Sequence, residues 1–312
     1  VWVVRKLLAR RKAQSLETAL DQNAAQAAQQ AAAHKKEEVA ALRARMKGAL
    51  ETLRGSKLGQ LSGGAALYEL PWYLVIGNPA AGKSTAIVKS GLKFPFADGG
   101  DSVIQGIGGT RNCDWFFTSE GILVDTAGRY SVHEEDREEW LGFLGLLKKH
   151  RPKAPINGIL IVASVADLAN QRPEQSIQLA KSLRQRVQEL TEKLEVFAPV
   201  YLVFSKADLI AGFTEFFEDR DPAERERVWG ATFTYSQQAP AAGVAAFDER
   251  FDELVDGLKD MCVAHMSMRR GEAMPPGVLT FPVEFAALKP VFRAFVNTLF
   301  EENPYQYRPV FR

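Results

Sequence analysis

An eight-residue glycine loop constrains this chain more than any other stretch of its sequence. Gly77 to Ser84 fits the pattern G-x-x-x-x-G-K-S, and the apolar run 73–76 before it is typical of a buried strand. The glycines let the backbone bend and turn its N–H groups inward, where a side chain would block an anion. A helix that begins near Lys83 would point its positive end at the same place. The stretch predicts strand, phosphate-binding loop and helix; the alternative is a chance glycine turn beside a surface lysine.

The residue types in this loop match the needs of a nucleoside triphosphate. Lys83 supplies a positive charge for the β- and γ-phosphates, and the Ser84 hydroxyl is placed to bind Mg²⁺. We therefore predict a nucleotide and Mg²⁺ as the cofactors. The predicted nucleotide contacts in this part of the chain are Gly77, Asn78, Ala81, Gly82, Lys83, Ser84 and Thr85.

A second motif, D-x-x-G, follows the apolar run 122–124 and occupies Asp125 to Gly128. A carboxylate at the end of a neighbouring strand can hold Mg²⁺ through water, so Asp125 joins Ser84 as a predicted metal contact. Gly128 carries no side chain and can offer its N–H to a γ-phosphate. By itself the pattern suits many turns, and its position after a matching phosphate loop is what gives it weight.

A third motif ends the apolar run 200–204. Ser205, Lys206 and Asp208 resemble the [NT]KxD element of GTPases, in which the carboxylate accepts two hydrogen bonds from guanine and the lysine stem packs over the base. Serine in the first position departs from the usual residue, so GTP and ATP both stay open, and the alternative is a polar strand end. Thr234 and Ser236 stand where a further base-contacting loop would fall.

Two residues near these motifs are candidates for catalysis. Thr110, in a glycine-rich loop, matches a switch threonine that contacts Mg²⁺ and the γ-phosphate. Arg129 follows Gly128 where Ras-like enzymes have a glutamine; it cannot accept a proton, but it or Arg111 can neutralise transition-state charge. The alternative for both arginines is a surface or salt-bridged role. We therefore expect slow intrinsic hydrolysis.

Alternating strand and helix patterns predict an α/β fold of the Ras-like P-loop NTPase type, with an N-terminal helix and a C-terminal helical extension. Uniformly apolar strands indicate a mostly parallel sheet with helices on both faces, and 119–121 predict one antiparallel hairpin at its edge. The expected strands are 113–118, 122–124, 157–163 and 200–204, and the expected helices are 13–53, 85–92, 134–150, 173–197, 247–269 and 284–302.

The ends and the composition add coarser expectations. The chain opens with apolar residues 1–4 followed by clustered positive charges, so 1–12 is interpreted as the cytoplasmic end of a transmembrane helix; the alternative is an arbitrary start before a basic helix. Residues 13–66 are then expected to form a helix and connector, 67–245 the NTPase domain and 246–312 a truncated helical extension.

A net charge of +1 gives no electrostatic case for nucleic acid, and Cys113 and Cys262 are expected to be reduced thiols, one disulfide being the alternative.

Five segments in order, GNPAAGKST, GIGGTRNCDWFF, ILVDTAGRY, NGILIVASVADL and YLVFSKADLIAGFTEFF, resemble the cytoplasmic domain of the TssM/IcmF family of the bacterial type VI secretion system. WGATF, FPVEF and NPYQ extend the resemblance over most of 70–312. It implies a Ras-like domain between transmembrane helices of the bacterial inner membrane, facing the cytoplasm. Implied partners are TssL, the baseplate and further TssM copies, with TssJ meeting a periplasmic region.

Three functional hypotheses follow. The first is a scaffold whose nucleotide state reorders the loops around Thr110 and Arg129 and so changes partner contacts. The second is a purely structural domain without turnover, because some members of the family lack an intact phosphate loop. The third is a targeting GTPase of the signal-recognition type, which shares a DTAGR sequence.

Overall fold

The computed structural model describes residues 70–94, 113–118, 120–131, 136–225, 227–233, 242–268 and 273–312, together with 44 and 48. Thr110, Arg111, Thr234, Ser236 and most of the expected N-terminal helix lie outside the described residues. The chain divides into two compact units. The first comprises Val1–Pro79, Leu92–Ile159 and Glu189–Val196, and the second comprises Ala80–Gly91, Leu160–Gln188 and Phe197–Arg312.

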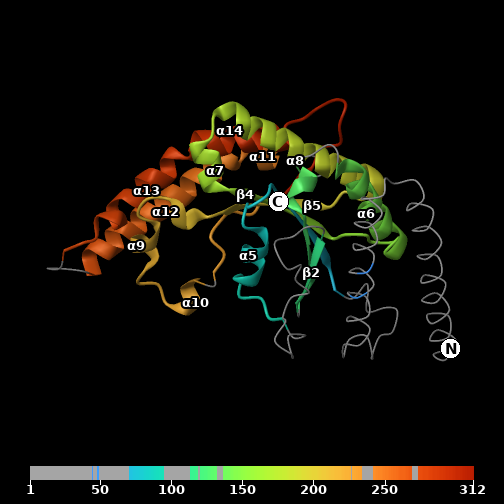
Figure 1. The fold of residues 1–312 in the computed structure, drawn as a ribbon. Coiled ribbons are helices and arrows are strands. Elements are labelled where there is room, and N and C mark those ends of the chain that lie inside the picture. The colour runs from blue at the N-terminus through green and yellow to red at the C-terminus, as the bar shows by residue number, and fades with distance from the viewer. Residues whose placement is uncertain are drawn as a thin grey trace. The chain divides into compact units, whose positions relative to one another are not determined.

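The described strands form a six-stranded sheet in the order β2-β3-β1-β4-β5-β6. Figure 1 labels three of its strands, β2, β4 and β5. β1 pairs with β3 in parallel and β5 pairs with β6 in parallel, whereas β2 and β3 run antiparallel. The expected α/β class, mixed sheet and antiparallel edge hairpin are therefore confirmed. The strands are β1 (Trp72–Ile76), β2 (Cys113–Phe117), β3 (Ile122–Thr126), β4 (Gly158–Ser164), β5 (Pro199–Ser205) and β6 (Val310–Phe311).

In the first unit, β1 and the hairpin of β2 and β3 pack against a shared apolar core. Every residue of β2 and β3 is buried, including the charged side chains of Asp114 and Asp125. Trp72 and Trp115 meet edge to face with ring centroids 5.1 Å apart. Thr118 closes the hairpin, because its hydroxyl accepts from the Gly121 N–H at 2.9 Å and donates to the Gly121 carbonyl at 2.8 Å.

Helix α6 (Arg137–His150) is the principal helix of the first unit. Trp140, Phe143, Leu144 and Leu147 recur at helical spacing and are all buried, so this face of α6 contributes to the core. Acidic residues lie in its first turn and basic residues in its last turn, which complements the helix dipole at both ends. The pattern over 134–150 therefore predicted α6 from Arg137 to His150, and residues 134 and 135 lie outside the described residues.

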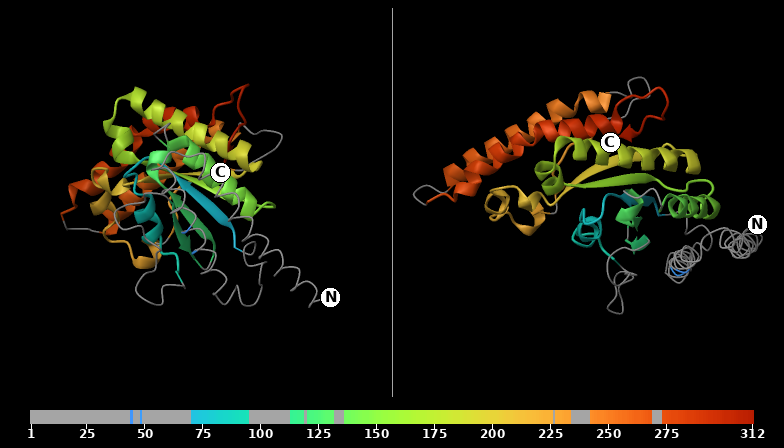
Figure 2. Two further views of the ribbon diagram at one scale, coloured as in Figure 1. Left: turned by 45° about the vertical axis from the view of Figure 1, so that its right-hand side comes forward. Right: turned by 45° about the horizontal axis from the view of Figure 1, so that its top comes forward.

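The second unit is mainly helical. Within it α12 runs along α13 and α14, as Figure 2 shows. Aromatic rings fill the space between α9, α12 and α13; for example, Phe216 and Phe281 lie 5.1 Å apart and Phe251 stacks on Phe285 at 4.9 Å. The helices are α5 (Lys83–Val88), α7 (Val165–Asn170), α8 (Pro173–Leu194, which ends in the first unit), α9 (Phe213–Phe217), α10 (Pro222–Arg225), α11 (Ala242–Ala245), α12 (Phe247–Met268), α13 (Pro276–Ala287) and α14 (Lys289–Phe300).

Helix ends differ from the expectations where a local backbone feature intervenes. The first helix was expected over 85–92 but ends at Val88, because the Ser90 hydroxyl donates to the Ile87 carbonyl at 2.6 Å and Gly91 adopts φ +77°. The long helix expected over 173–197 ends at Leu194, where Glu195 turns to φ +58°. None of the described helices is both long and apolar enough to cross a bilayer.

Candidate functional site

The glycine loop connects β1 to α5, which is the strand–loop–helix context that its motif requires. Ala80 and Gly82 both have left-handed backbones, with φ +58° and +82°. A left-handed alanine costs roughly 1–2 kcal/mol, and such strain concentrates at functional sites. Gly82 is followed directly by helical Lys83, and such a change of hand is the backbone pattern of an anion-binding nest.

In the first unit, the residues that follow β3 lie directly against the start of the loop. A methyl group at Gly128 would overlap the backbone nitrogen of Pro79 and lie 2.7 Å from the carbonyl carbon of Asn78, so only glycine fits. The Ser131 hydroxyl donates to the Gly77 carbonyl at 3.3 Å, and the Thr126 hydroxyl donates to the Val75 carbonyl at 2.8 Å. The D-x-x-G motif therefore holds the first half of the glycine loop.

In the second unit, β5 holds the later half of the loop. The Ser205 hydroxyl lies 2.5 Å from the Ala81 carbonyl and 3.3 Å from the Ala163 carbonyl at the end of β4. A Cβ atom at Gly82 would lie 3.9 Å from the Ser205 side chain, so the two residues are in ordinary van der Waals range. The serine that departs from the usual GTPase pattern thus makes a short contact to the loop backbone.

Burial separates the other predicted contacts into two sets. Lys83 is 7% exposed and Asp125 is fully buried, which is unusual for charged side chains and marks them as built into the structure. Thr85 and Asp208 are exposed, and Ser84 is partly buried. Lys206 adopts φ +58° as β5 ends, so the chain turns sharply before it reaches Asp208.

A second acidic residue lies beside Asp125 in the first unit. Asp114 of β2 lies directly opposite it in the antiparallel ladder and is also buried. These carboxylates contribute to raising the pKa of the Cys113 thiol, although burial of the thiol is the larger cause. Cys113 and Cys262 are both free thiols, as expected. No group of three or more metal-type ligands occurs among the residues that the structure describes.

Arg129 forms a partly buried ion-pair network in the first unit. It pairs with Asp136 at 3.0 Å and with Glu139 of α6 at 2.9 Å. The Tyr130 hydroxyl also donates to Glu139, and the pKa of Tyr130 is raised, chiefly by burial. The structure therefore places the predicted catalytic arginine in the salt-bridged state that was its alternative interpretation. No local pattern pointed to Glu139, because this residue is one of several carboxylates near the start of α6.

The predicted residues are thus brought together in two groups, each within one unit. Gly77 and Asn78 lie with Gly128 in the first, and Ala81 and Gly82 lie with Ser205 in the second. The supporting residues Thr126 and Ser131 were not predicted. A hydroxyl after a strand is the only sequence signal they carry, and it is too common to be specific.

Residues 133–312 match the family model of the IcmF-related N-terminal domain, and the chain belongs to this family. It is similar to the type VI secretion system component TssM1 of Pseudomonas aeruginosa PAO1, with 44% identity over 282 residues, 88% of this chain. The chain spans 26% of the length of that relative.

A solved structure in complex with GDP, an ADP-ribosylation-factor-like or SAR1 small GTPase from Encephalitozoon cuniculi, matches at a TM-score of 0.32 with 19% identity. The match covers 61% of this chain and 67% of that one.

Proposed function

We propose that this chain is the nucleotide-binding region of a type VI secretion membrane component, with a Ras-like P-loop fold that acts as scaffold and switch. The observation that carries the proposal is the G-x-x-x-x-G-K-S loop between β1 and α5, with left-handed backbones at Ala80 and Gly82. Family membership removes the support for a signal-recognition-type GTPase, because that alternative depended on the DTAGR sequence alone.

The residues present fit a nucleotide with Mg²⁺. Gly128 lies so close to Asn78 and Pro79 that a methyl group has no room, and glycine therefore lets the D-x-x-G turn approach the loop backbone directly. In the proposed complex, Lys83 and the loop amides bind the phosphates, and Ser84 and Asp125 hold Mg²⁺, partly through water. The bound Mg²⁺ would neutralise phosphate charge.

The identity of the base is proposed from β5. Asp208 is exposed and could accept hydrogen bonds from guanine, which favours GTP, while the hydroxyl of Ser205 is occupied by its contact to Ala81. Thr110 and Arg129 remain proposed as the residues that order around the phosphate and neutralise charge. Turnover is expected to be slow, because Arg129 is held by Asp136 and Glu139.

The cellular setting is proposed from the family and its relative. TssM1 is a type VI secretion component, and this chain matches only a quarter of it. We place the chain on the cytoplasmic side of the bacterial inner membrane, anchored through flanking transmembrane helices. Its proposed partners are TssL, baseplate components and other TssM copies, and TssJ would meet a periplasmic region of the same protein.

Lys83→Ala is expected to weaken nucleotide binding about 100-fold, because a charged contact to phosphate is lost. Fluorescently labelled GTP and ATP, each with Mg²⁺, would be titrated against the original chain and the variant. Lys89→Ala is the matched control, since Lys89 lies at the exposed end of the same helix and should leave the affinity unchanged.

The outcomes separate the proposal from the purely structural alternative. Saturable binding that is lost only in Lys83→Ala supports the nucleotide site. Equal binding to both variants would show that the loop has been misassigned. If neither nucleotide binds the original chain, the domain is a scaffold without a nucleotide.

A further inference from the structure

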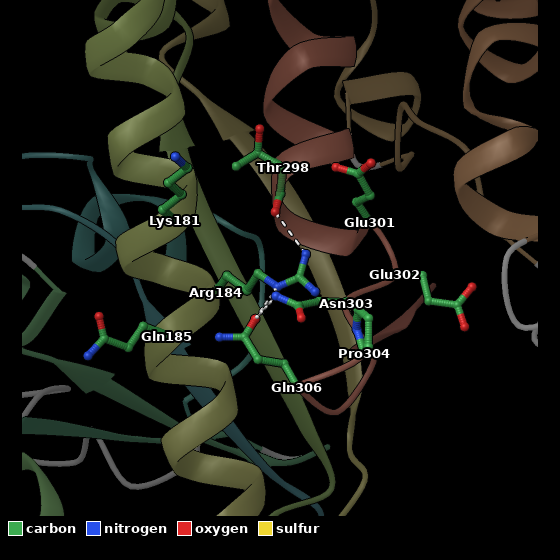
Figure 3. A pocket seen from close by; sticks show the side chains of 9 residues that line it. All are labelled: Lys181, Arg184, Gln185, Thr298, Glu301, Glu302, Asn303, Pro304 and Gln306. Carbon is green, nitrogen blue, oxygen red and sulfur yellow. Dashed lines mark hydrogen bonds between the residues drawn. The ribbon is translucent and has the colours of Figure 1, made fainter.

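A polar cavity in the second unit lies far along the sequence from the glycine loop. It has a volume of about 650 Å³ and opens between α8 and the segment that follows α14. Figure 3 shows its lining, with the guanidinium of Arg184 in the middle between the helix and this segment. The size falls in the range of small-molecule sites, and every lining residue except Pro304 has a polar or charged side chain.

Arg184 is only 8% exposed, and two of its three nitrogens have partners. Nε donates to the Gln306 side chain at 2.9 Å, and Nη1 donates to the Thr298 carbonyl at 3.1 Å near the end of α14. Nη2 is buried, and no described residue accepts a hydrogen bond from it. Burial lowers the pKa of Arg184, with Glu301 opposing this effect and Arg308 adding to it. A buried cation with a donor left over is a strong recognition element for an anion.

The other charges around the cavity limit which anion fits. Lys181 lies one helical turn before Arg184 on α8 and is exposed, so it adds a second positive charge at the opening. Glu301 and Glu302 are also among the lining residues, and their negative charges would repel a dianion more than a singly charged anion. A singly charged carboxylate is therefore favoured over inorganic phosphate.

We propose that this cavity binds a carboxylate group, held by Arg184 and Lys181. The carboxylate belongs either to a small organic acid or to an acidic side chain of a protein partner. The site is independent of the glycine loop, so it can hold even if no nucleotide binds. The cavity is lined by residues of α8 and of 301–306, so binding should change the environment of both segments.

The test is a titration of the ¹⁵N-labelled chain followed by NMR, at constant ionic strength. Three probes are used: acetate, blocked glutamate (N-acetyl-glutamate amide) and inorganic phosphate. Both carboxylates should give saturable shifts in the amides of 181–185 and 301–306, with phosphate at least about threefold weaker. Blocked glutamate binding more tightly than acetate identifies a protein side chain as the source, and equal affinities identify a small acid.

Charge variants at the rim test the assignment without touching the bonds that Arg184 makes to α14. Lys181→Ala should weaken acetate binding about threefold, and Glu302→Gln should tighten it by a similar factor. Lys193→Ala, an exposed lysine further along α8, is the control and should change nothing. The proposal is overturned if acetate gives no saturable shifts, if phosphate binds as tightly as acetate, or if the two rim variants do not differ in sign.

Discussion

Gly128→Ala should destabilise the chain by about 2–3 kcal/mol, because the added methyl group has no space. It would overlap the backbone nitrogen of Pro79, and it would lie 2.5 Å from the Pro79 Cα atom and 2.7 Å from the Asn78 carbonyl carbon. These are backbone atoms and cannot rotate away as a side chain can. Either the glycine loop or the turn after β3 must shift. Urea unfolding followed by circular dichroism measures the loss.

Gly142→Ala provides the matched control for this variant. Gly142 lies inside α6 of the same unit, and a methyl group there would meet nothing within 4 Å. Alanine in an open helical position should stabilise the chain by about 0.5–1 kcal/mol. If Gly128→Ala were as stable as Gly142→Ala, Gly128 would not lie against the backbone of Asn78 and Pro79 as described.

Gly212→Ala should cost about 3 kcal/mol or more, for two separate reasons. Gly212 adopts φ +81° immediately before α9, where an L-residue is strained. A methyl group there would also overlap the carbonyl oxygen of Gly277 and lie 2.9 Å from the Gly277 Cα atom, near the start of α13. The clash would separate α9 from α13 and open the aromatic core between them. Thermal unfolding of the variant gives the size of the effect.

Two further glycine substitutions in the same unit provide stabilities with which that of Gly212→Ala can be compared. Gly257→Ala in α12 meets nothing within 4 Å and should be neutral or stabilising. Gly277→Ala should have an intermediate effect, because the outer atoms of Glu215 can move away from the methyl group but its Cβ atom, 2.9 Å away, cannot. A Gly212→Ala variant as stable as Gly257→Ala would show that α9 and α13 do not touch as described.

Local sequence patterns predicted the elements whose signal is contained within a few residues. The run 73–76 gave β1, and the turn residues 119–121 gave the antiparallel hairpin, because each of these depends on neighbouring residues alone. The glycine loop falls between a strand and a helix, as its motif requires. The reason is physical: inward-facing amides need glycine and a helix start at fixed offsets.

Elements that depend on distant partners were missed or misplaced. β6 has only two residues and exists because Val310 and Phe311 pair with Pro199 and Val200 of β5, which no local pattern reveals. The helix expected to begin at residue 284 begins at Pro276. Pro282 suggests a break, but Val278, Phe281 and Phe285 are buried on the same helix, and their packing outweighs the lost hydrogen bond.

In the candidate site, too, local motifs were predictable and tertiary contacts were not. The motifs named the residues, but not the contacts that the structure shows for them, which are Gly128 against Asn78 and Ser205 against Ala81. They could not give the partners of Arg129, because an arginine in a loop can pair with any carboxylate that the fold brings near. The choice of Glu139 follows from the burial of α6 against the first unit, which is a tertiary effect.

The central claim is that the main-chain amides of Ala80 to Ser84 hold the phosphates of a nucleotide. Hydrogen–deuterium exchange of this peptide, with and without GTP or ATP and Mg²⁺, tests it most directly. We predict that exchange of these amides slows when nucleotide is added to the original chain and does not slow in Lys83→Ala. The claim would be contradicted if the chain were saturated with nucleotide, as shown by slower exchange in another segment, while exchange of the Ala80–Ser84 amides stayed unchanged.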